Sequence, residues 1–227
     1  MIKALIWNVR GIGGKESIAR VKNLSRMHNI KLIVLIEPLI ASGKISSTAS
    51  KLGFSNYVAN CSNKIWIMWN NNIIARILSD FPQSDFNTIT TATKRRGGNR
   101  ANSAAMDDFN NVIADSNLND IGFTGTPFTW YRSGLWKCLD RLLFNNEWIS
   151  MFPTSYVEHL SRTLSDHSPL LLTIRASRNV GNFAFRFQNM WLTHVDFKNV
   201  INSNWNAPIF PNNDIKGMFR LWSKLSR

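Results

Sequence analysis

The chain has 227 residues, of which 44% are hydrophobic and 18% are charged. This composition is typical of a globular protein and excludes a disordered one. The length suits one domain of the larger α/β kind, or one ordinary domain with an extension. The 27 Lys and Arg outnumber the 14 Asp and Glu, for a formal charge of +13. Such an excess indicates a nucleic-acid partner, because phosphate neutralisation supplies most of the non-specific affinity; a basic surface without a ligand is the alternative.

The sequence indicates neither a membrane protein nor a thiolate metal site. No apolar stretch reaches the roughly 18 residues of a membrane span, and residues 1–7 are too short an apolar run for a signal peptide. We therefore expect an intracellular protein without a membrane partner. Cys61 and Cys138 lack a CxxC or CxxH spacing, so we interpret both as small buried hydrophobic residues, and not as zinc ligands or a disulfide.

The N-terminal segment predicts a strand–helix–strand unit. Residues 3–9 are an apolar run that ends at Asn8 and a glycine-rich loop, residues 16–30 carry apolar side chains at steps of three, and residues 31–36 are a second apolar run that ends at Glu37. Such a unit makes the two strands parallel neighbours. Asn8 and Glu37 should then lie side by side at the edge where open α/β sheets bind their ligands.

The middle of the chain predicts short antiparallel strands and then an irregular basic segment. Three apolar runs separated by Asn-rich turns predict a meander over residues 54–59, 64–69 and 73–78. The pattern breaks at Pro82, because proline removes a ladder donor. The polar residues 88–100 predict a loop that holds the basic cluster Lys94, Arg95 and Arg96. We expect this cluster, together with Arg10, to contact the phosphates of a nucleic acid.

The second half predicts two helices, several strands and one turn with a chemical signature. The helices are expected at residues 103–116, capped by Asn102 or Ser103, and at residues 145–152. The strands are expected at residues 128–132, 139–144, 155–160 and 170–174. Asp140 lies among apolar neighbours, where a buried charge requires a partner. The turn Ser165-Asp166-His167-Ser168-Pro169 leads directly into the last strand.

Polar residues at the predicted strand ends suit phosphate chemistry assisted by a metal ion. They are Asn8, Glu37, Asp85, Asn87, Asp140, Asp166 and His167. Carboxylate and amide oxygens suit a hard cation such as Mg²⁺. A histidine beside an aspartate suits proton transfer or the stabilisation of charge at phosphorus.

Five motifs occur in a fixed order along the chain. They are Trp7-Asn8-Val9-Arg10-Gly11, Ile36-Glu37, Ser84-Asp85-Phe86-Asn87, Leu139-Asp140-Arg141 and Ser165-Asp166-His167-Ser168-Pro169. In this order they resemble the endonuclease/exonuclease/phosphatase family and, within it, the endonuclease domain of plant LINE-type, non-LTR retrotransposons. The resemblance extends to residues 123–130 and 185–192. It implies a two-sheet α/β sandwich, truncated internally, that hydrolyses phosphodiesters with Mg²⁺ or Mn²⁺.

The same resemblance implies which residues would hold the metal ion. Glu37 and Asp166 would be its ligands, and Asn8 would help to fix the geometry of the site. The metal would neutralise charge that develops on the phosphate.

The resemblance also implies four further catalytic roles. Asp85 would orient the attacking water, and Asn87 would hold the scissile phosphate. Asp140 would orient His167, which would stabilise the transition state. The substrate would be DNA, nicked in the nucleus to provide a primer.

By this resemblance, residues 1–175 form the endonuclease-like domain and residues 176–227 form a basic, aromatic-rich extension. In the relatives the extension leads to a reverse transcriptase, which this sequence does not encode. The sequence departs from the family near residues 79–85, where several tens of residues are missing, among them the family's catalytic tyrosine. Two functions therefore stay open: a DNA-nicking endonuclease, or an inactive remnant that at most binds nucleic acid. They differ in whether Asp85 reaches the metal site. A third function, a phosphatase acting on a small or lipid phosphate, is disfavoured by the charge of +13 and by the retroelement-like extension.

Overall fold

The computed structural model describes residues 1–73, 87–175 and 197–206. The chain divides into two compact units, Met1–Arg178 and Asn179–Arg227, and the second is described only through helix α5 (Phe197–Asn206). Asp85, the expected deletion near residues 79–85 and all but the first residue of the strand expected at 73–78 lie outside the described residues. None of the helices in the described ranges has both the length and the apolar character needed to cross a membrane.

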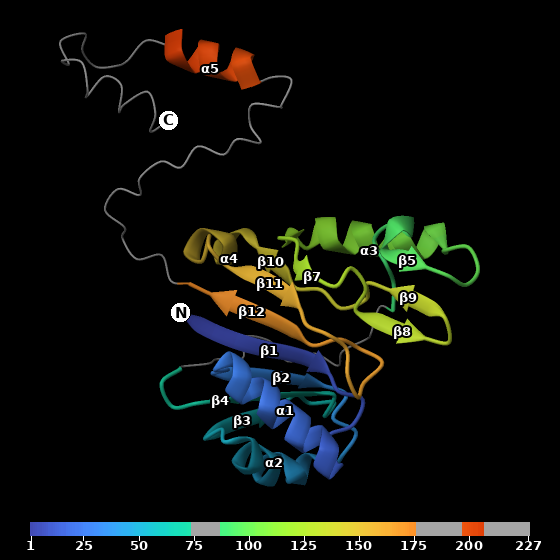
Figure 1. Cartoon of the computed structure of the whole chain (residues 1–227), viewed down its shortest axis with the longest axis vertical. Coiled ribbons are helices and arrows are strands. Elements are labelled where there is room, and N and C mark those ends of the chain that lie inside the picture. Colours follow the sequence, from blue (N-terminus) through green and yellow to red (C-terminus); the bar gives the residue numbers. More distant parts are fainter. Residues whose placement is uncertain (74–86, 176–196, 207–227) are drawn as a thin grey trace, which may run out of the picture. The chain divides into compact units, whose positions relative to one another are not determined.

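Seven strands of the first unit form one mixed sheet, called here the main sheet, in the order β3-β4-β2-β1-β12-β11-β7 (Figure 1). Their bounds are β1 Ile2–Asn8, β2 Leu32–Ile36, β3 Asn56–Ala59, β4 Ile65–Trp69, β7 Thr124–Gly125, β11 Tyr156–His159 and β12 Leu170–Ile174. β1 is parallel to β2, with Asn8 opposite Ile36, and antiparallel to β12, with Ile6 opposite Leu170. The C-terminal ends of β1 and β2 therefore meet the N-terminal end of β12 at one edge.

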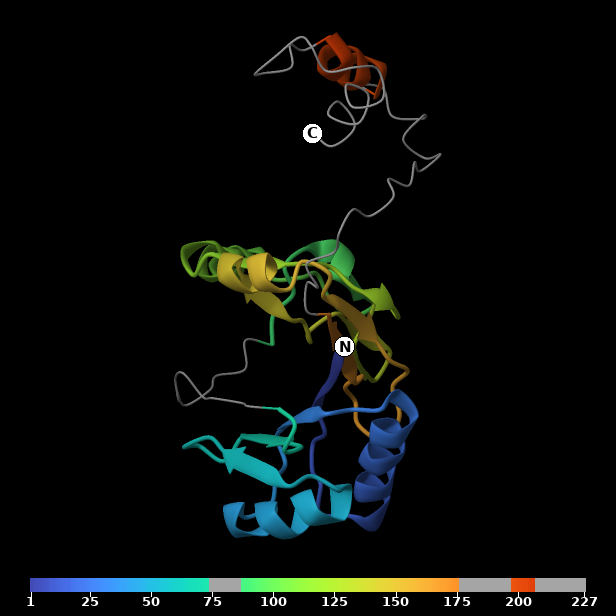
Figure 2. The ribbon, with the colours of Figure 1, turned by 90° about the vertical axis from the view of Figure 1, so that its left-hand side faces the viewer.

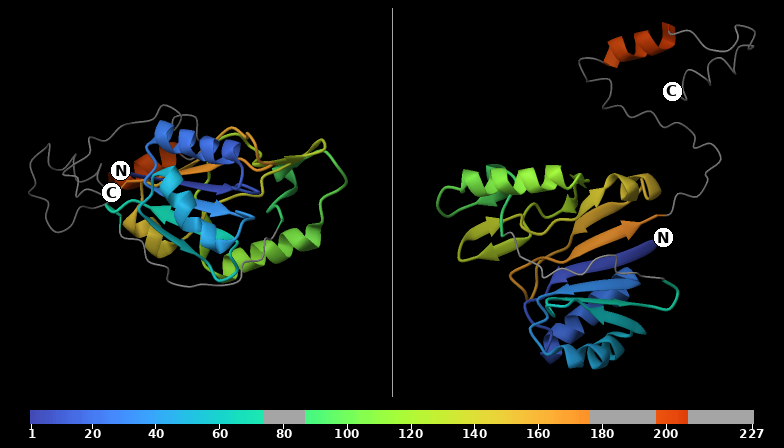
Figure 3. Two further views of the ribbon diagram at one scale, coloured as in Figure 1. Left: turned by 90° about the horizontal axis from the view of Figure 1, so that it is seen from below. Right: turned by 180° about the vertical axis from the view of Figure 1, so that it is seen from behind.

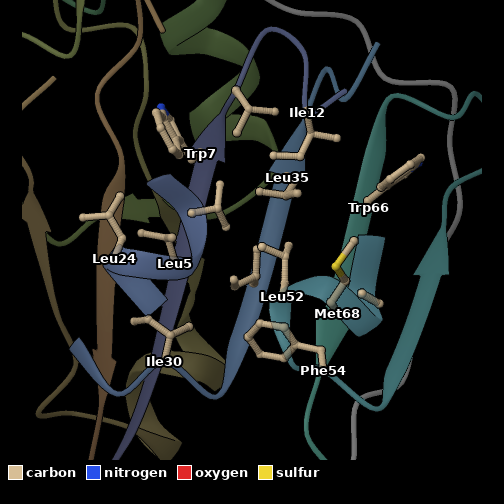
Figure 4. Packing of buried hydrophobic residues seen from close by; sticks show 14 of the residues in the cluster. Leu5, Trp7, Ile12, Leu24, Ile30, Leu35, Leu52, Phe54, Trp66 and Met68 are labelled. Atoms are coloured by element: carbon tan, nitrogen blue, oxygen red, sulfur yellow. The ribbon is translucent and has the colours of Figure 1, made fainter. Parts of the chain in front are cut away.

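Helices α1 (Lys15–His28) and α2 (Ile45–Leu52) pack on one face of the main sheet. A 3₁₀ turn, Ser42–Lys44, precedes α2. α1 returns the chain from β1 to β2 and buries Val21 and Leu24, because side chains three residues apart share a helix face. Figure 4 shows the resulting core. It includes Leu5, Trp7, Val21, Leu24, Ile33, Leu35, Leu52, Trp66 and Met68.

The opposite face of the main sheet carries a second layer of two small sheets, in the orders β10-β6 and β5-β9-β8, with two helices. The elements are β5 Arg95–Arg96, α3 Ser103–Asp115, β6 Leu118–Asp120, β8 Trp130–Arg132, β9 Leu135–Lys137, β10 Leu143–Asn145 and α4 Asn146–Met151. Figures 2 and 3 show α3 and α4 on the side away from α1 and α2. Phe144 packs in a second, smaller core with Ala4, Val157 and Leu172 of the main sheet.

This arrangement is the α/β sandwich that the sequence predicts, but three local predictions are wrong. The strand expected at residues 139–144 begins only at Leu143, because the Leu139 and Asp140 N–H groups donate to Thr129 Oγ1. The loop expected at residues 88–100 contains a 3₁₀ turn, Ala92–Lys94, and the strand β5. Cys61 is exposed, because it lies in the turn between β3 and β4, whereas Cys138 is buried.

Candidate active site

The loops that follow β1 and β2 are hydrogen-bonded to each other. The Val9 N–H group donates to Ile36 O at 3.0 Å, and the Gly11 N–H group donates to Glu37 O at 2.9 Å. Arg10 and Glu37 adopt positive φ angles of 46° and 52°. Non-glycine residues occupy this region at a cost of about 1–3 kcal/mol, and such residues concentrate at functional sites. The paired loops therefore fix Arg10 and Glu37 beside each other at the edge of the main sheet.

The turn between β11 and β12 is held against β1 by side-chain hydrogen bonds. Ser165 Oγ donates to Asn8 O at 2.8 Å and accepts from the His167 N–H group at 3.1 Å, and Trp7 Nε1–H donates to His167 O at 3.0 Å. The Ser165–Asn8 bond joins residues that are 157 positions apart in the sequence, and the Trp7–His167 bond joins residues that are 160 positions apart. The tertiary fold thus places His167 next to Asn8.

His167 and Asp140 form a buried pair. Nδ1 of His167 lies 2.9 Å from both carboxylate oxygens of Asp140, so this nitrogen carries a proton and donates it. The His167 side chain is 2% exposed, and its Nε2 lies 3.9 Å from Asp166 Oδ1. Nε2 is buried and has no hydrogen-bond partner among the described residues. Nε2 can therefore accept or donate a hydrogen bond that the described residues do not supply.

Thr129 positions the Asp140–His167 pair from behind. Its side chain is fully buried, and its Oγ1 accepts from the Leu139 N–H group at 3.1 Å and from the Asp140 N–H group at 2.9 Å. Its carbonyl oxygen accepts from the Ser168 N–H group at 2.6 Å. One residue therefore fixes the backbone of Asp140 and of Ser168, the residue that follows His167.

The two carboxylate oxygens of Asp166 have different surroundings. Trp130 Nε1–H donates to Oδ2 at 3.0 Å. Oδ1 is buried and accepts no hydrogen bond from the described residues, although it makes an ionic contact with Arg10 Nε at 3.4 Å. The same Nε atom lies 3.5 Å from Glu37 Oε2. The Arg10 guanidinium group thus lies between two carboxylates.

A cavity of about 360 Å³ opens beside these groups. Its polar lining consists of Asn8, Glu37, Lys64, Asn87, Thr88, Asp140, Arg141 and His167, and its apolar wall includes Ile6, Ile36 and Phe109. Arg141 is fixed in the wall of the cavity, because its Nη1 donates to Thr90 Oγ1 at 2.9 Å and its Nη2 donates to Cys138 O at 2.8 Å. Lys64 is the other cationic side chain of this lining.

The structure brings together six of the seven residues predicted to act in catalysis or metal binding. Five of them line the cavity, namely Asn8, Glu37, Asn87, Asp140 and His167, and Asp166 contacts both His167 and Arg10. Asp85 lies outside the described residues. The roles that the sequence assigns to these residues stay predictions.

The donor atoms at this edge fit one hard cation. Glu37 Oε2 and Asp166 Oδ1 both lie within 3.5 Å of the same Arg10 nitrogen, so one positively charged group can contact both oxygens. Mg²⁺ is commonly bound through one or two carboxylates and keeps several waters. Over residues 1–73, 87–175 and 197–206, no group of three or more His, Cys, Asp or Glu residues could hold a metal ion. The two carboxylates would therefore hold an ion whose remaining ligands are water or substrate.

The four residues predicted to contact nucleic acid differ in how far other groups of the chain already engage their side chains. Arg10 is engaged with two carboxylates, Lys94 Nζ lies 4.6 Å from the centre of the Phe123 ring, and Arg95 Nε donates to Gly97 O at 3.1 Å. Arg96 is exposed. β5, which carries the two arginines, pairs with β9, and β9 pairs with β8 next to the site. Arg95 and Arg96 are thus in the same small sheet as Trp130, which donates to the site residue Asp166.

Burial raises the pKa of the Cys138 thiol, against the opposing effect of the nearby Arg141 and Lys94 cations. A buried thiol with a raised pKa stays protonated and is neither a nucleophile nor a metal ligand. Cys138 therefore contributes packing, and not chemistry, to the segment that leads to Asp140.

Sequence reasoning does not assign site roles to Thr129, Trp130 and Ser165. All three lie inside motifs that were recognised, residues 123–130 and 165–169. Their contacts join them to residues far along the chain, such as Trp130 with Asp166 across 36 positions. The only signal in the sequence is their position next to the predicted site residues.

The described fold is similar to that of the endonuclease domain of TRAS1, a telomere-specific non-LTR retrotransposon. The TM-score is 0.53 at 11% sequence identity, and the match covers 78% of this chain and 99% of that chain. At this identity the likeness concerns the fold, so the chain has the α/β sandwich fold of a retrotransposon endonuclease domain. No protein-family model and no curated protein matched the sequence.

Proposed function

We propose that the chain is a metal-dependent phosphodiester hydrolase that nicks DNA, of the kind encoded by plant LINE-type retrotransposons. The observation that carries the proposal is the Nε2 atom of His167, which is buried beside the cavity without a hydrogen bond from the described residues, with Asp140 on the opposite ring nitrogen. A histidine held in this way can exchange a proton with a reacting group or donate to a phosphate oxygen. The fold shared with an endonuclease domain supports the same function.

The residues of this chain would act on a phosphodiester in the cavity. Asp140 keeps the His167 ring oriented, so that Nε2 can exchange a proton with a reacting group or, when it carries a proton, donate to a phosphate oxygen as negative charge builds there. The Asn87 side chain, at the cavity wall, would hold the phosphate in place. Lys64 adds a positive charge to the same wall.

Glu37 and Asp166 would hold a divalent cation, Mg²⁺ or Mn²⁺. When bound, the cation supplies a Lewis acid that neutralises charge on the phosphate oxygens. Trp130 would keep Asp166 in the orientation that presents Oδ1 to the site, because it donates to Oδ2.

The formal charge of +13 favours DNA as the substrate, because each neutralised phosphate adds salt-sensitive affinity. Arg96 is exposed, and we expect Lys94 and Arg95 beside it to take part in contacting the DNA backbone. A DNA-cutting role places the protein in the nucleus.

Nicking of supercoiled plasmid by the purified full chain in Mg²⁺ tests the proposal. His167→Ala and Asp166→Ala should each lower the rate by at least about 10²-fold, the effect of losing one group that stabilises a transition state, and EDTA should abolish nicking. Asp108→Asn is the matched control, since Asp108 is exposed on α3 and its loss should leave the rate unchanged. Nicking that persists in both site variants would overturn the assignment.

A second function, nucleic-acid binding without catalysis, is favoured by one observation. The described residues offer two carboxylates, and no larger acidic or histidine group, to a metal ion. A folded parent protein that binds DNA in a salt-dependent way but nicks no faster than the Asp166→Ala variant would establish this second function instead.

A further inference from the structure

Arg10 is placed where a cation would be expected at this site. Its Nε atom lies 3.5 Å from Glu37 Oε2 and 3.4 Å from Asp166 Oδ1. Neither contact has hydrogen-bond geometry, and Asp166 Oδ1 is a buried oxygen with no hydrogen-bond donor among the described residues. The guanidinium group therefore acts on these two oxygens mainly through its charge.

We propose that Arg10 is an internal counter-ion that competes with a divalent cation for Glu37 and Asp166. This inference rests on the proposed metal-dependent function and deepens it, because it names what regulates access of the metal to the two carboxylates. In the protein without metal, the Arg10 charge offsets the repulsion between the carboxylates. A divalent cation binds them only when the Arg10 side chain moves aside.

The backbone supports a built-in position for this side chain. Arg10 has a φ angle of 46° and is followed by Gly11 at 111°, and both residues lie in the loop that is hydrogen-bonded to Glu37. Asn8 Oδ1 accepts from the Arg10 N–H group at 3.3 Å. The backbone of Arg10 is thus fixed by hydrogen bonds to the ends of β1 and β2, and its side chain extends from this fixed point to the two carboxylates.

The Arg10 side chain also has room to leave. It is 39% exposed, whereas the Glu37 and Asp166 side chains are 26% and 22% exposed. Arg10 and Glu37 also line a second, open hollow of about 740 Å³ with Lys64. A cation between the two carboxylates would repel the guanidinium group at close range, and the side chain can move toward solvent through its flexible stem.

Binding of Mn²⁺ alone, without DNA, tests the proposal on the full chain. The dissociation constant for Mn²⁺ is measured by calorimetry, or by electron paramagnetic resonance of the free ion, for the parent and for Arg10→Gln. Gln keeps the side chain polar and the positive φ equally strained, and it removes the charge. We expect Arg10→Gln to bind Mn²⁺ about tenfold more tightly, a typical size for coupling between two ligands of one site.

Two further variants separate the specific effect from general electrostatics. Arg10→Lys keeps the charge and should bind Mn²⁺ within about threefold of the parent. Arg26→Gln removes an exposed charge from the last turn of α1, which lies at the opposite end of the parallel strands from the site. This variant should change the dissociation constant for Mn²⁺ by less than about twofold. Both limits are small against the tenfold effect expected of Arg10→Gln.

Thermal unfolding gives a readout that does not depend on either binding method. Without metal, Arg10→Gln should unfold at a lower temperature than the parent, because two carboxylates lose their counter-ion. Mn²⁺ should raise its midpoint by more than it raises that of the parent, because a ligand that binds the native state stabilises it by RT ln(1 + [L]/Kd), which grows as the dissociation constant falls. If Arg10→Gln does not fold, Arg10→Met takes its place, because it also removes the charge, and Mn²⁺ should again raise its midpoint by more than it raises that of the parent.

Equal or weaker Mn²⁺ binding by Arg10→Gln, or no Mn²⁺ binding by any variant, would overturn the proposal. Failure of the counter-ion proposal can be told apart from failure of the proposed function, because Mn²⁺ binding and nicking are measured separately. Tighter binding by Arg10→Gln together with an absence of nicking would support the counter-ion and refute only the catalytic activity.

Discussion

The two faces of the main sheet differ in how they are covered. On β2, Ile33 and Leu35 are fully buried beneath α1 and α2, whereas the residues that alternate with them are half-buried toward the second layer. Alternate side chains of a strand point to opposite faces, so one strand serves a closed apolar core on one side and the wall of the site on the other. Stability and site geometry therefore come from different faces of the same strands.

The largest expected effect comes from truncating one apolar side chain on each face of the main sheet. Ile33→Ala should lower the free energy of unfolding by about 2–5 kcal/mol, the range for a buried large-to-small change. Ile67 lies on the opposite face of β4 from the buried Trp66 and Met68 and is half-buried, so Ile67→Ala should cost about 1–2 kcal/mol, since less of its apolar surface is removed from water on folding. Urea unfolding measures both. Equal losses would mean that the second face is as fully covered as the first.

The next effect sharpens the role of hydrogen bonds on the site face. Thr129→Val keeps the side-chain shape but removes the acceptor of the Leu139 and Asp140 N–H groups. Leaving such donors unsatisfied should cost about 1–3 kcal/mol, and nicking should fall because Asp140 is no longer fixed behind His167. Urea unfolding and the nicking rate are the measurements.

Thr91→Val is the matched control for this change, because Thr91 is exposed and surface substitutions stay within about 0.5 kcal/mol. A Thr129→Val protein as stable as the Thr91→Val protein would contradict the positioning role.

The difference between the faces also explains what could be predicted from the sequence. The strands β1 and β2 and the helix between them were predictable because their apolar spacing is local, and the parallel pairing then put Asn8 and Glu37 together. The placement of Asp140 was not, since its apolar neighbours imitate a strand while Thr129 captures its backbone.

The contacts that orient Asp166 and His167 also escaped prediction. Trp130 donates to Asp166, and Trp7 donates to His167 O across 160 positions. A periodic pattern carries no information on such pairings, because they depend on how the two layers come together. Sequence alone therefore predicted which residues meet, and not what holds them in place.

A smaller effect compares one helix from each layer. α1 has no side-chain cap at Gly14 but buries Val21 and Leu24, whereas α3 buries only Phe109 and is capped by Asn102, whose side chain accepts from the Ala105 N–H group. Asn102→Ala should therefore cost about 1 kcal/mol. Hydrogen exchange should speed up for α3 amides and stay unchanged for α1 amides, and unchanged α3 exchange would show that packing, not the cap, holds this helix.

The smallest expected effect is the contribution of His159 to the pH dependence of stability. His159 on β11 is buried, stacks on Phe123 with ring centres 3.8 Å apart, and has its Nδ1 2.9 Å from Thr126 O. Burial lowers the pKa of His159 below its ordinary value of 6.5, against a raising effect of the Thr126 hydrogen bond. The unfolded chain therefore takes up a proton on this residue at a higher pH than the folded chain does.

The sign of the pH dependence follows from this difference. The contribution of His159 to stability is complete above pH 6.5, the ordinary pKa of the group, and is lost as the pH falls through the lower pKa of the folded state. Urea midpoints measured from pH 7.5 downward should therefore decrease more steeply for the parent than for His159→Gln, which cannot take up the proton. Parallel pH profiles would show that acid weakens the molecule elsewhere, and a steeper profile for His159→Gln would reverse the assigned direction of the pKa shift.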